Sequence, residues 1–167
     1  MNRLKRASFT AVALMAASSA HAITNDHGVV VFTQADALAG NVTPGDTPGF
    51  PVTLSVAGAS YRLGSSLTVT SAANGIEVRA NEVSLDMGGF TLAGSGAGRN
   101  GIASFNRALR VANGTVRGFT NDGIRTIATF LTVSKMIVTA NGRHGIIADD
   151  TGSQAEAMAF ARVSDSS

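Results

Sequence analysis

Cysteine and tryptophan are absent from this chain, tyrosine occurs once, and there are only three prolines. Without cysteine the chain can form no disulfide, cysteine-ligated zinc finger, iron–sulfur cluster or cysteine nucleophile. Packing and backbone hydrogen bonds must therefore hold the fold together. The scarcity of tryptophan and tyrosine also removes the commonest aromatic platforms for sugar rings.

The amino-terminal segment 1–22 has the composition of a signal peptide. Its start includes the basic side chains Arg3, Lys5 and Arg6, an apolar run covers 11–20, and Ala20-His21-Ala22 supplies the small residues that signal peptidase reads. The apolar run is shorter than the roughly 20 residues of a membrane-spanning helix, and no later stretch approaches that length. We expect cleavage after Ala22, export to the periplasm or beyond in a bacterium, and no membrane-spanning segment.

Removing this segment reverses the sign of the net charge. The whole chain has 13 Lys+Arg and 11 Asp+Glu, and the predicted signal peptide holds three of the basic residues and none of the acidic ones, so the remainder carries 10 minus 11, or −1. The basic pI therefore comes from the export signal, and we expect no nucleic-acid partner.

A repeat of about 22 residues dominates the rest of the chain. Four Gly-Ile dipeptides begin at Gly75, Gly101, Gly123 and Gly145, with spacings of 26, 22 and 22. Aliphatic or aromatic residues follow the first three glycines in three columns, which are Val83/Leu109/Leu131, Leu85/Val111/Val133 and Phe90/Val116/Val138. The first unit carries four extra residues around 94–98. The fourth fits if eight residues are inserted within 148–158, which places Val163 in the second column.

The apolar residues alternate in short runs, as in extended strands with side chains on alternate faces. Three short strands and three turns use about 22 residues, so the sequence predicts an all-β fold, a right-handed parallel β-helix with a short N-terminal cap. We expect the four glycines at one corner of every coil, in a left-handed or otherwise strained backbone. The residues before them are Asn74, Asn100, Asp122 and His144.

The chain divides into a signal peptide (1–22), an N-terminal cap with a proline-rich loop (23–51) and the coils (52–167). Thr33 and Asp36 have the spacing of a capping box, and Gly40 is placed to end a short helix. The sequence stops within the fourth repeat, so we expect an incomplete solenoid whose last coil is covered by missing coils or by another subunit.

Residues 45–167 resemble the N-terminal part of exported bacterial right-handed parallel β-helix repeat proteins of the pectate-lyase-like superfamily, most of them uncharacterised. The runs that carry the resemblance are TPGFPVTLSVAGASYRLGSSLTV, NGIEVRANEVSLDMGGFTLAG and LRVANGTVRGFTNDGI. Better-known members include polysaccharide lyases, galacturonan hydrolases, alginate epimerases and phage tailspikes. The resemblance implies a surface suited to long polysaccharides, and it does not by itself imply catalysis.

Carboxylate, arginine and histidine side chains gather in one part of the sequence, which makes Asp122, Arg143, His144, Asp149 and Asp150 the candidate binding residues. Calcium prefers such oxygen ligands and is the one cofactor that this cluster could hold. The structural alternative is stronger, because His144 occupies a corner position and adjacent aspartates point to opposite faces of a strand. We assign no catalytic residue and no metal ligand.

An outward row of arginines (Arg107, Arg110, Arg117, Arg125 and Arg143) could bind acidic sugars, although such side chains also keep β-edges soluble. Two functions remain. The first is a non-catalytic module that binds polysaccharide or displays a surface. The second is the N-terminal part of a carbohydrate-active enzyme, a lyase or a glycoside hydrolase. The absence of a stacked row of carboxylates favours the first function, whereas the missing C-terminal cap keeps the second function, and with it enzyme activity, open.

Overall fold

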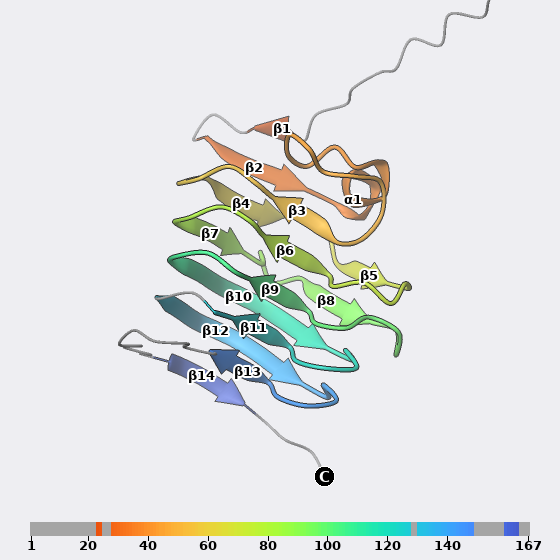
Figure 1. The fold of residues 1–167 in the computed structure, drawn as a ribbon, viewed down its shortest axis with the longest axis vertical. Helices are drawn as coiled ribbons and strands as arrows, with labels where there is room; N and C mark the ends of the chain where they lie inside the picture. Colours follow the sequence, from red (N-terminus) through yellow and green to blue (C-terminus); the bar gives the residue numbers. More distant parts are fainter. Residues whose placement is uncertain (1–22, 25–27, 128–129, 149–158, 164–167) are drawn as a thin grey trace, which may run out of the picture.

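The computed structural model describes residues 23–24, 28–127, 130–148 and 159–163. They form a parallel β-solenoid of about four turns, with almost no helix (Figure 1). The strands are β1 (Ile23–Thr24), β2 (Val29–Phe32), β3 (Val52–Leu54), β4 (Ser60–Leu63), β5 (Leu67–Val69), β6 (Ile76–Val78), β7 (Val83–Asp86), β8 (Thr91–Gly94), β9 (Ile102–Ser104), β10 (Leu109–Arg117), β11 (Ile124–Thr126), β12 (Leu131–Thr139), β13 (Ile146–Ala148) and β14 (Ala159–Val163). The predicted all-β class and parallel β-helix are confirmed.

Two sheets form the walls of the solenoid. Sheet A runs in the order β1-β2-β4-β7-β10-β12-β14, with β5 and β8 joining it at one side. Sheet B runs in the order β13-β11-β9-β6-β3. Among the described strands, every pairing is parallel except that of β1 with β2. A chain that leaves one sheet therefore returns to it one coil later, about 4.8 Å along the solenoid axis.

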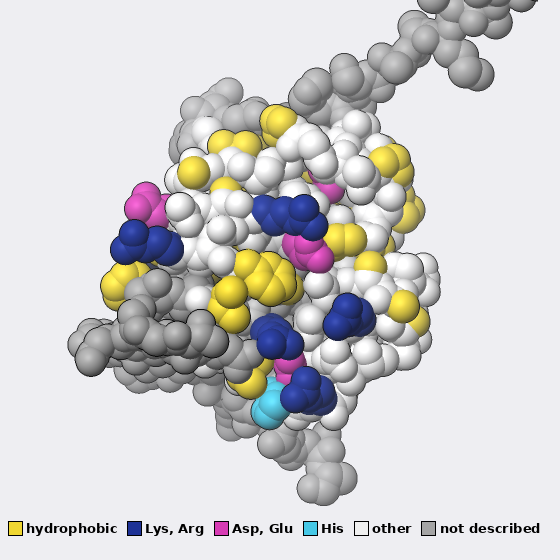
Figure 2. Space-filling view, viewed as in Figure 1, with side chains coloured by type: hydrophobic (Ala, Val, Ile, Leu, Met, Phe, Trp, Pro, Cys, Tyr) yellow, Lys and Arg dark blue, Asp and Glu magenta, His cyan; other side chains and the backbone are white. Residues whose placement is uncertain are grey.

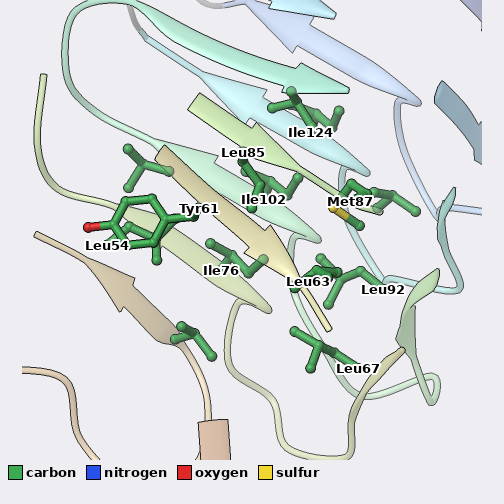
Figure 3. Packing of buried hydrophobic residues seen from close by; sticks show 14 of the residues in the cluster. Leu54, Tyr61, Leu63, Leu67, Ile76, Leu85, Met87, Leu92, Ile102 and Ile124 are labelled. Atoms are coloured by element: carbon green, nitrogen blue, oxygen red, sulfur yellow. The ribbon is translucent and has the colours of Figure 1, made fainter. Parts of the chain in front are cut away.

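The predicted apolar columns lie inside the tube. Ile76, Ile102, Ile124 and Ile146 are in register in sheet B, and Val52 begins their row. Leu85, Val111 and Val133 form the facing row in sheet A. Figure 3 shows Ile76, Ile102 and Ile124 beside Leu85. Ile76, Ile102 and Ile124 are fully buried, and each such side chain contributes about 1.5–3 kcal/mol on burial.

The third predicted column is wrong in its first member. Val116 pairs with Leu92, not with Phe90, and Leu92 is fully buried whereas Phe90 is half-buried. Leu92 follows Leu85 by seven positions along the chain, whereas Val116 follows Val111 by only five. Two of the four extra residues of this unit therefore belong to the turn at Gly88–Gly89, where both glycines have positive φ.

The predicted position of Val163 is also wrong. Val163 pairs with Val138, and the partner of Val133 is Ala159. Val133 and Ala159 are 26 positions apart, which is four more than the repeat of 22, whereas eight more were expected. The register then shifts between Ser134 and Ile137. Over this stretch β14 uses one residue fewer than β12, because Ser134 pairs with Phe160 and Ile137 pairs with Arg162. The predicted insertion itself lies mainly in 149–158, outside the described residues.

The predicted capping box is confirmed. Helix α1 (Gln34–Ala39) begins after Thr33, whose side chain accepts a hydrogen bond from the backbone N–H of Asp36, and the Asp36 carboxylate accepts one from the backbone of Thr33. Gly40 ends the helix in the left-handed conformation, with φ 71°. No helix in the described part of the chain is long and apolar enough to cross a membrane.

The left-handed backbone predicted as one alternative for the corner glycines is wrong, since none of Gly75, Gly101, Gly123 and Gly145 has a positive φ. Glycine is needed there because neighbouring coils approach closely. A Cβ atom on Gly75 would lie 2.7 Å from the carbonyl oxygen of Gly101, and one on Gly101 would lie 2.5 Å from that of Gly123. Both distances are too short for a side chain.

Candidate functional site

The residues before the corner glycines form a polar ladder along the solenoid. The Oδ1 atom of Asn74 accepts hydrogen bonds from the backbone N–H of Asn100, at 3.1 Å, and from its Nδ2 atom, at 2.9 Å. The Oδ1 atom of Asn100 accepts the backbone N–H of Asp122 at 3.2 Å. Each side chain therefore satisfies the backbone of the coil above, which explains why polar residues recur at this position.

Asp122 and His144 end the ladder. The Oδ1 atom of Asp122 lies 2.8 Å from Nδ1 of His144 and also accepts the backbone N–H of His144 at 3.3 Å. The Asp122 side chain is 1% exposed, whereas that of His144 is 48% exposed. The structure thus brings together two of the five predicted site residues.

The other three candidates do not complete a site with this pair. Arg143 is exposed, and its backbone N–H donates to the carbonyl oxygen of Asn121 on the coil below. Asp149 and Asp150 lie outside the described residues. Among the residues that the structure describes, no three His, Asp or Glu side chains are close enough to hold a metal ion. The geometry of Asp122 and His144 is that of a structural ladder with one half-exposed imidazole.

The predicted row of arginines does not exist as a row. Arg110 and Arg117 lie in β10 of sheet A, while Arg125 lies in β11 of sheet B. Arg107 and Arg143 precede strands of different sheets. The sequence spacing missed this because a coil places neighbouring segments on opposite walls of the tube.

A groove crosses the outer face of sheet A. A cavity of about 460 Å³ is lined by Glu82, Val83, Ser84, Ala108, Arg110, Phe130 and Thr132. A second cavity, of about 240 Å³, is lined by Ser84, Leu85, Asp86, Arg110, Val111, Ala112, Thr132 and Ser134. The two share Ser84, Arg110 and Thr132, so together they form one groove over β7, β10 and β12, which we call the sheet A groove.

Hydroxyl groups and one cation dominate the middle of this groove. Ser84, Arg110 and Thr132 are in register on three successive coils. No ion pair involves Arg110 among the described residues. Phe130, at the end of the groove where β12 begins, is 51% exposed.

The carboxylate of Asp86 is already engaged. Its Oδ1 atom accepts the backbone N–H of Gly88 at 2.8 Å and Nδ2 of Asn113 at 3.1 Å, and its Oδ2 atom lies 3.8 Å from Nε of Arg62. The residues in register with it on the next coils are Ala112 and Ser134. No row of carboxylates therefore runs along this part of the groove.

Sequence reasoning missed the groove as a site, although it singled out Arg110. The available signal was the position of Ser84, Arg110 and Thr132, each of which stands between two buried columns of the same strand and so points outward. Phe130 could not be found in this way because it lies in a turn. Comparison of the chain with protein-family models, curated proteins and solved structures finds no match.

Proposed function

We propose that this protein is an exported β-helix module that binds polysaccharide in the sheet A groove and does not itself cleave it. The observation that carries the proposal is the continuity of the groove over three coils, with outward side chains in register on each. An extended polymer lying across the strands would meet an outward polar side chain of β7, β10 and β12 in turn.

The lining suits sugar hydroxyls. Ser84 and Thr132 can each donate and accept a hydrogen bond, and Arg110 offers a planar set of donors with no competing carboxylate partner among the described residues. Phe130 adds an exposed aromatic face on which an apolar face of a sugar ring can pack. Ligand sites typically combine a concave surface, a small number of polar groups and an aromatic side chain.

Binding is favoured over catalysis by the state of the acidic groups. Glycoside hydrolysis generally requires two free carboxyl groups on either side of the scissile bond. Of the two described carboxylates that line the groove, Asp86 already accepts two hydrogen bonds within the protein, and no carboxylate is in register above it. Among the described residues of the groove, Glu82 is therefore the one carboxylate that is not already engaged within the protein.

Affinity electrophoresis of the mature protein through gels containing a panel of neutral and acidic polysaccharides tests the proposal. Arg110→Ala and Phe130→Ala should each weaken retardation by the polymer that binds, by about tenfold in Kd for a loss near 1.4 kcal/mol. Arg117→Ala, on the same strand, and Ile137→Ala, at an equally exposed apolar position, are matched controls outside the groove. Equal effects of the groove and control variants, or release of unsaturated or reducing ends, would contradict the proposal.

Export is supported by the basic start, the short apolar run and Ala20-His21-Ala22. Strand β1 begins at Ile23, so cleavage after Ala22 would leave the described fold whole. Sequencing the amino terminus of the protein recovered from periplasm and medium should give Ile23 first. A product that keeps the predicted signal peptide and stays in the cytoplasm would refute export without bearing on the groove.

A further inference from the structure

We propose that a second site, formed by Arg99 and Arg143 and here called the basic corner, binds the sulfate or phosphate esters of a polyanionic glycan. It lies beside the polar ladder and uses none of the residues that line the sheet A groove. The inference is therefore independent of the proposed polysaccharide site.

Arg99 and Arg143 are aligned along the solenoid axis. The backbone N–H of Asn121 donates to the carbonyl oxygen of Arg99 at 2.8 Å, and the backbone N–H of Arg143 donates to that of Asn121 at 2.9 Å. The three residues are thus stacked on successive coils, which places the two arginine backbones about 10 Å apart along the axis. Both arginines are exposed.

These two arginines differ from others whose side chains are neutralised. Arg62 lies 3.8 Å from Asp86, and Arg79 forms an ion pair with Glu77 at 2.8 Å. Within the described residues, no such ion pair involves Arg99 or Arg143. Arg125, on the neighbouring strand β11, has a partner within the protein and is therefore not part of the basic corner.

Asp122, the described acidic residue of the polar ladder, offers little negative charge to the surface here. Asp122 is 1% exposed, and its Oδ1 atom is held by the backbone and the ring of His144. Figure 2 shows the histidine with dark blue side chains close by and a smaller magenta patch between them. Among the described residues, the exposed charge at this corner is therefore mainly positive.

Two exposed arginines whose backbones lie about 10 Å apart suit a polymer with repeated anionic groups better than a single small anion, because each guanidinium can bind a separate group. Tetrahedral oxyanions offer several acceptor oxygens to such a donor fork. A glycan is favoured over nucleic acid because the mature chain has no excess of basic residues and no tryptophan to stack on bases.

Binding of the mature protein to immobilised dextran sulfate tests this inference, with unsubstituted dextran, carboxymethyl dextran and a double-stranded DNA fragment as further probes. The variant Arg99→Gln/Arg143→Gln should raise Kd for dextran sulfate by about tenfold or more. Arg107→Gln/Arg117→Gln removes the same charge from exposed positions elsewhere and should change Kd less than about twofold. Thermal unfolding of both variants checks that the fold is kept.

Equal losses in the two double variants would show attraction by net charge alone and would overturn the site. Tighter binding to DNA, or equal binding to carboxymethyl dextran, would overturn the assignment to sulfate or phosphate esters. The neutral polysaccharides of the affinity electrophoresis test the groove without involving the basic corner, and the comparison of the two double variants on dextran sulfate tests the basic corner. Failure of one site is thereby distinguished from failure of the other.

Discussion

Nδ1 of His144 lies 2.8 Å from Oδ1 of Asp122, and this contact repeats the bond that Nδ2 of Asn100 makes to Oδ1 of Asn74 at 2.9 Å. The imidazole thus stands in for an amide as the donor, and the carboxylate stands in for an amide as the acceptor. In both pairs the same oxygen also accepts the backbone N–H of the residue above. The pair extends a ladder that the lower coils build from asparagine.

Asp122→Ala should lower the free energy of unfolding by about 1–3 kcal/mol, because the backbone N–H of His144 then loses its acceptor. Asp122→Asn should cost less than about 1 kcal/mol, since asparagine serves the same purpose at Asn100. Urea unfolding of the three proteins measures the difference. If the asparagine variant were as unstable as the alanine variant, the ladder would depend on the charge of Asp122 and not on its oxygen.

Gly123→Ala should destabilise the protein by about 1–3 kcal/mol or more, because the new methyl group has no room. A Cβ atom there would contact Cγ1 of Val138 and would lie 2.6 Å from the carbonyl oxygen of Gly145. Thermal unfolding by circular dichroism gives the change.

Gly64→Ala is the matched control for this substitution. Gly64 also has no positive φ, but the two nearest neighbours of its Cβ would be side-chain methyl groups of Val31 and Thr33, at 3.1 and 3.2 Å, and the backbone oxygen of Phe32 would lie at an ordinary contact distance of 3.6 Å. A small shift of these groups can accommodate it. An equal loss of stability in both variants would mean that close stacking at the corner is not the reason for glycine.

Ala140→Gly should stabilise the protein by about 1 kcal/mol, because Ala140 has a φ of 52°, a conformation that costs a residue with a Cβ atom about 1–2 kcal/mol. One repeat earlier, Gly118 has a φ of 74°. Ala112→Gly, in strand β10, should instead destabilise by about 0.5–1 kcal/mol. Denaturant midpoints compare the two, and a loss of stability in both would contradict the argument.

The repeat was predictable from the sequence because burial in a solenoid acts on every coil alike. Ile76, Ile102 and Ile124 occupy one row, and any polar substitution there would bury an unpaired group. The spacing of these residues therefore carries the register of sheet B. The capping box of α1 was readable for a similar reason, since two side chains and two backbone groups satisfy one another locally.

The misplaced residues lie where turn length, not burial, sets the register. Phe90 and Leu92 are both apolar, and only the positive-φ turn at Gly88–Gly89 decides which of them enters the core. Val163 was misplaced for the same reason, because the insertion before Ala159 adds four residues to the repeat and not the expected eight. The groove was not predicted because no sequence motif unites its residues, which have in common only an outward position on adjacent coils.

Tyr61 combines burial with a hydroxyl group that lacks a hydrogen-bond partner among the described residues. Its side chain lies inside the solenoid, 1% exposed (Figure 3). Burial raises the pKa of the Tyr61 hydroxyl above its usual value of 10.0. The backbone of Val56 lowers this pKa by a smaller amount, although it is not placed to form a hydrogen bond with the hydroxyl. The folded protein therefore holds the phenolic proton more tightly than the unfolded chain does.

The contribution of Tyr61 to stability should be complete below about pH 10 and should fall as the pH rises from there toward the folded pKa. Tyr61→Phe should lose less stability over this range, and at pH 7 it should be as stable as the parent or more stable by about 1 kcal/mol. Because Tyr61 is the only tyrosine and tryptophan is absent, ultraviolet absorbance of tyrosinate reports this one group. A titration midpoint at or below pH 10 in the folded protein, or a Tyr61→Phe variant that is clearly less stable at pH 7, would show that the hydroxyl has a partner after all.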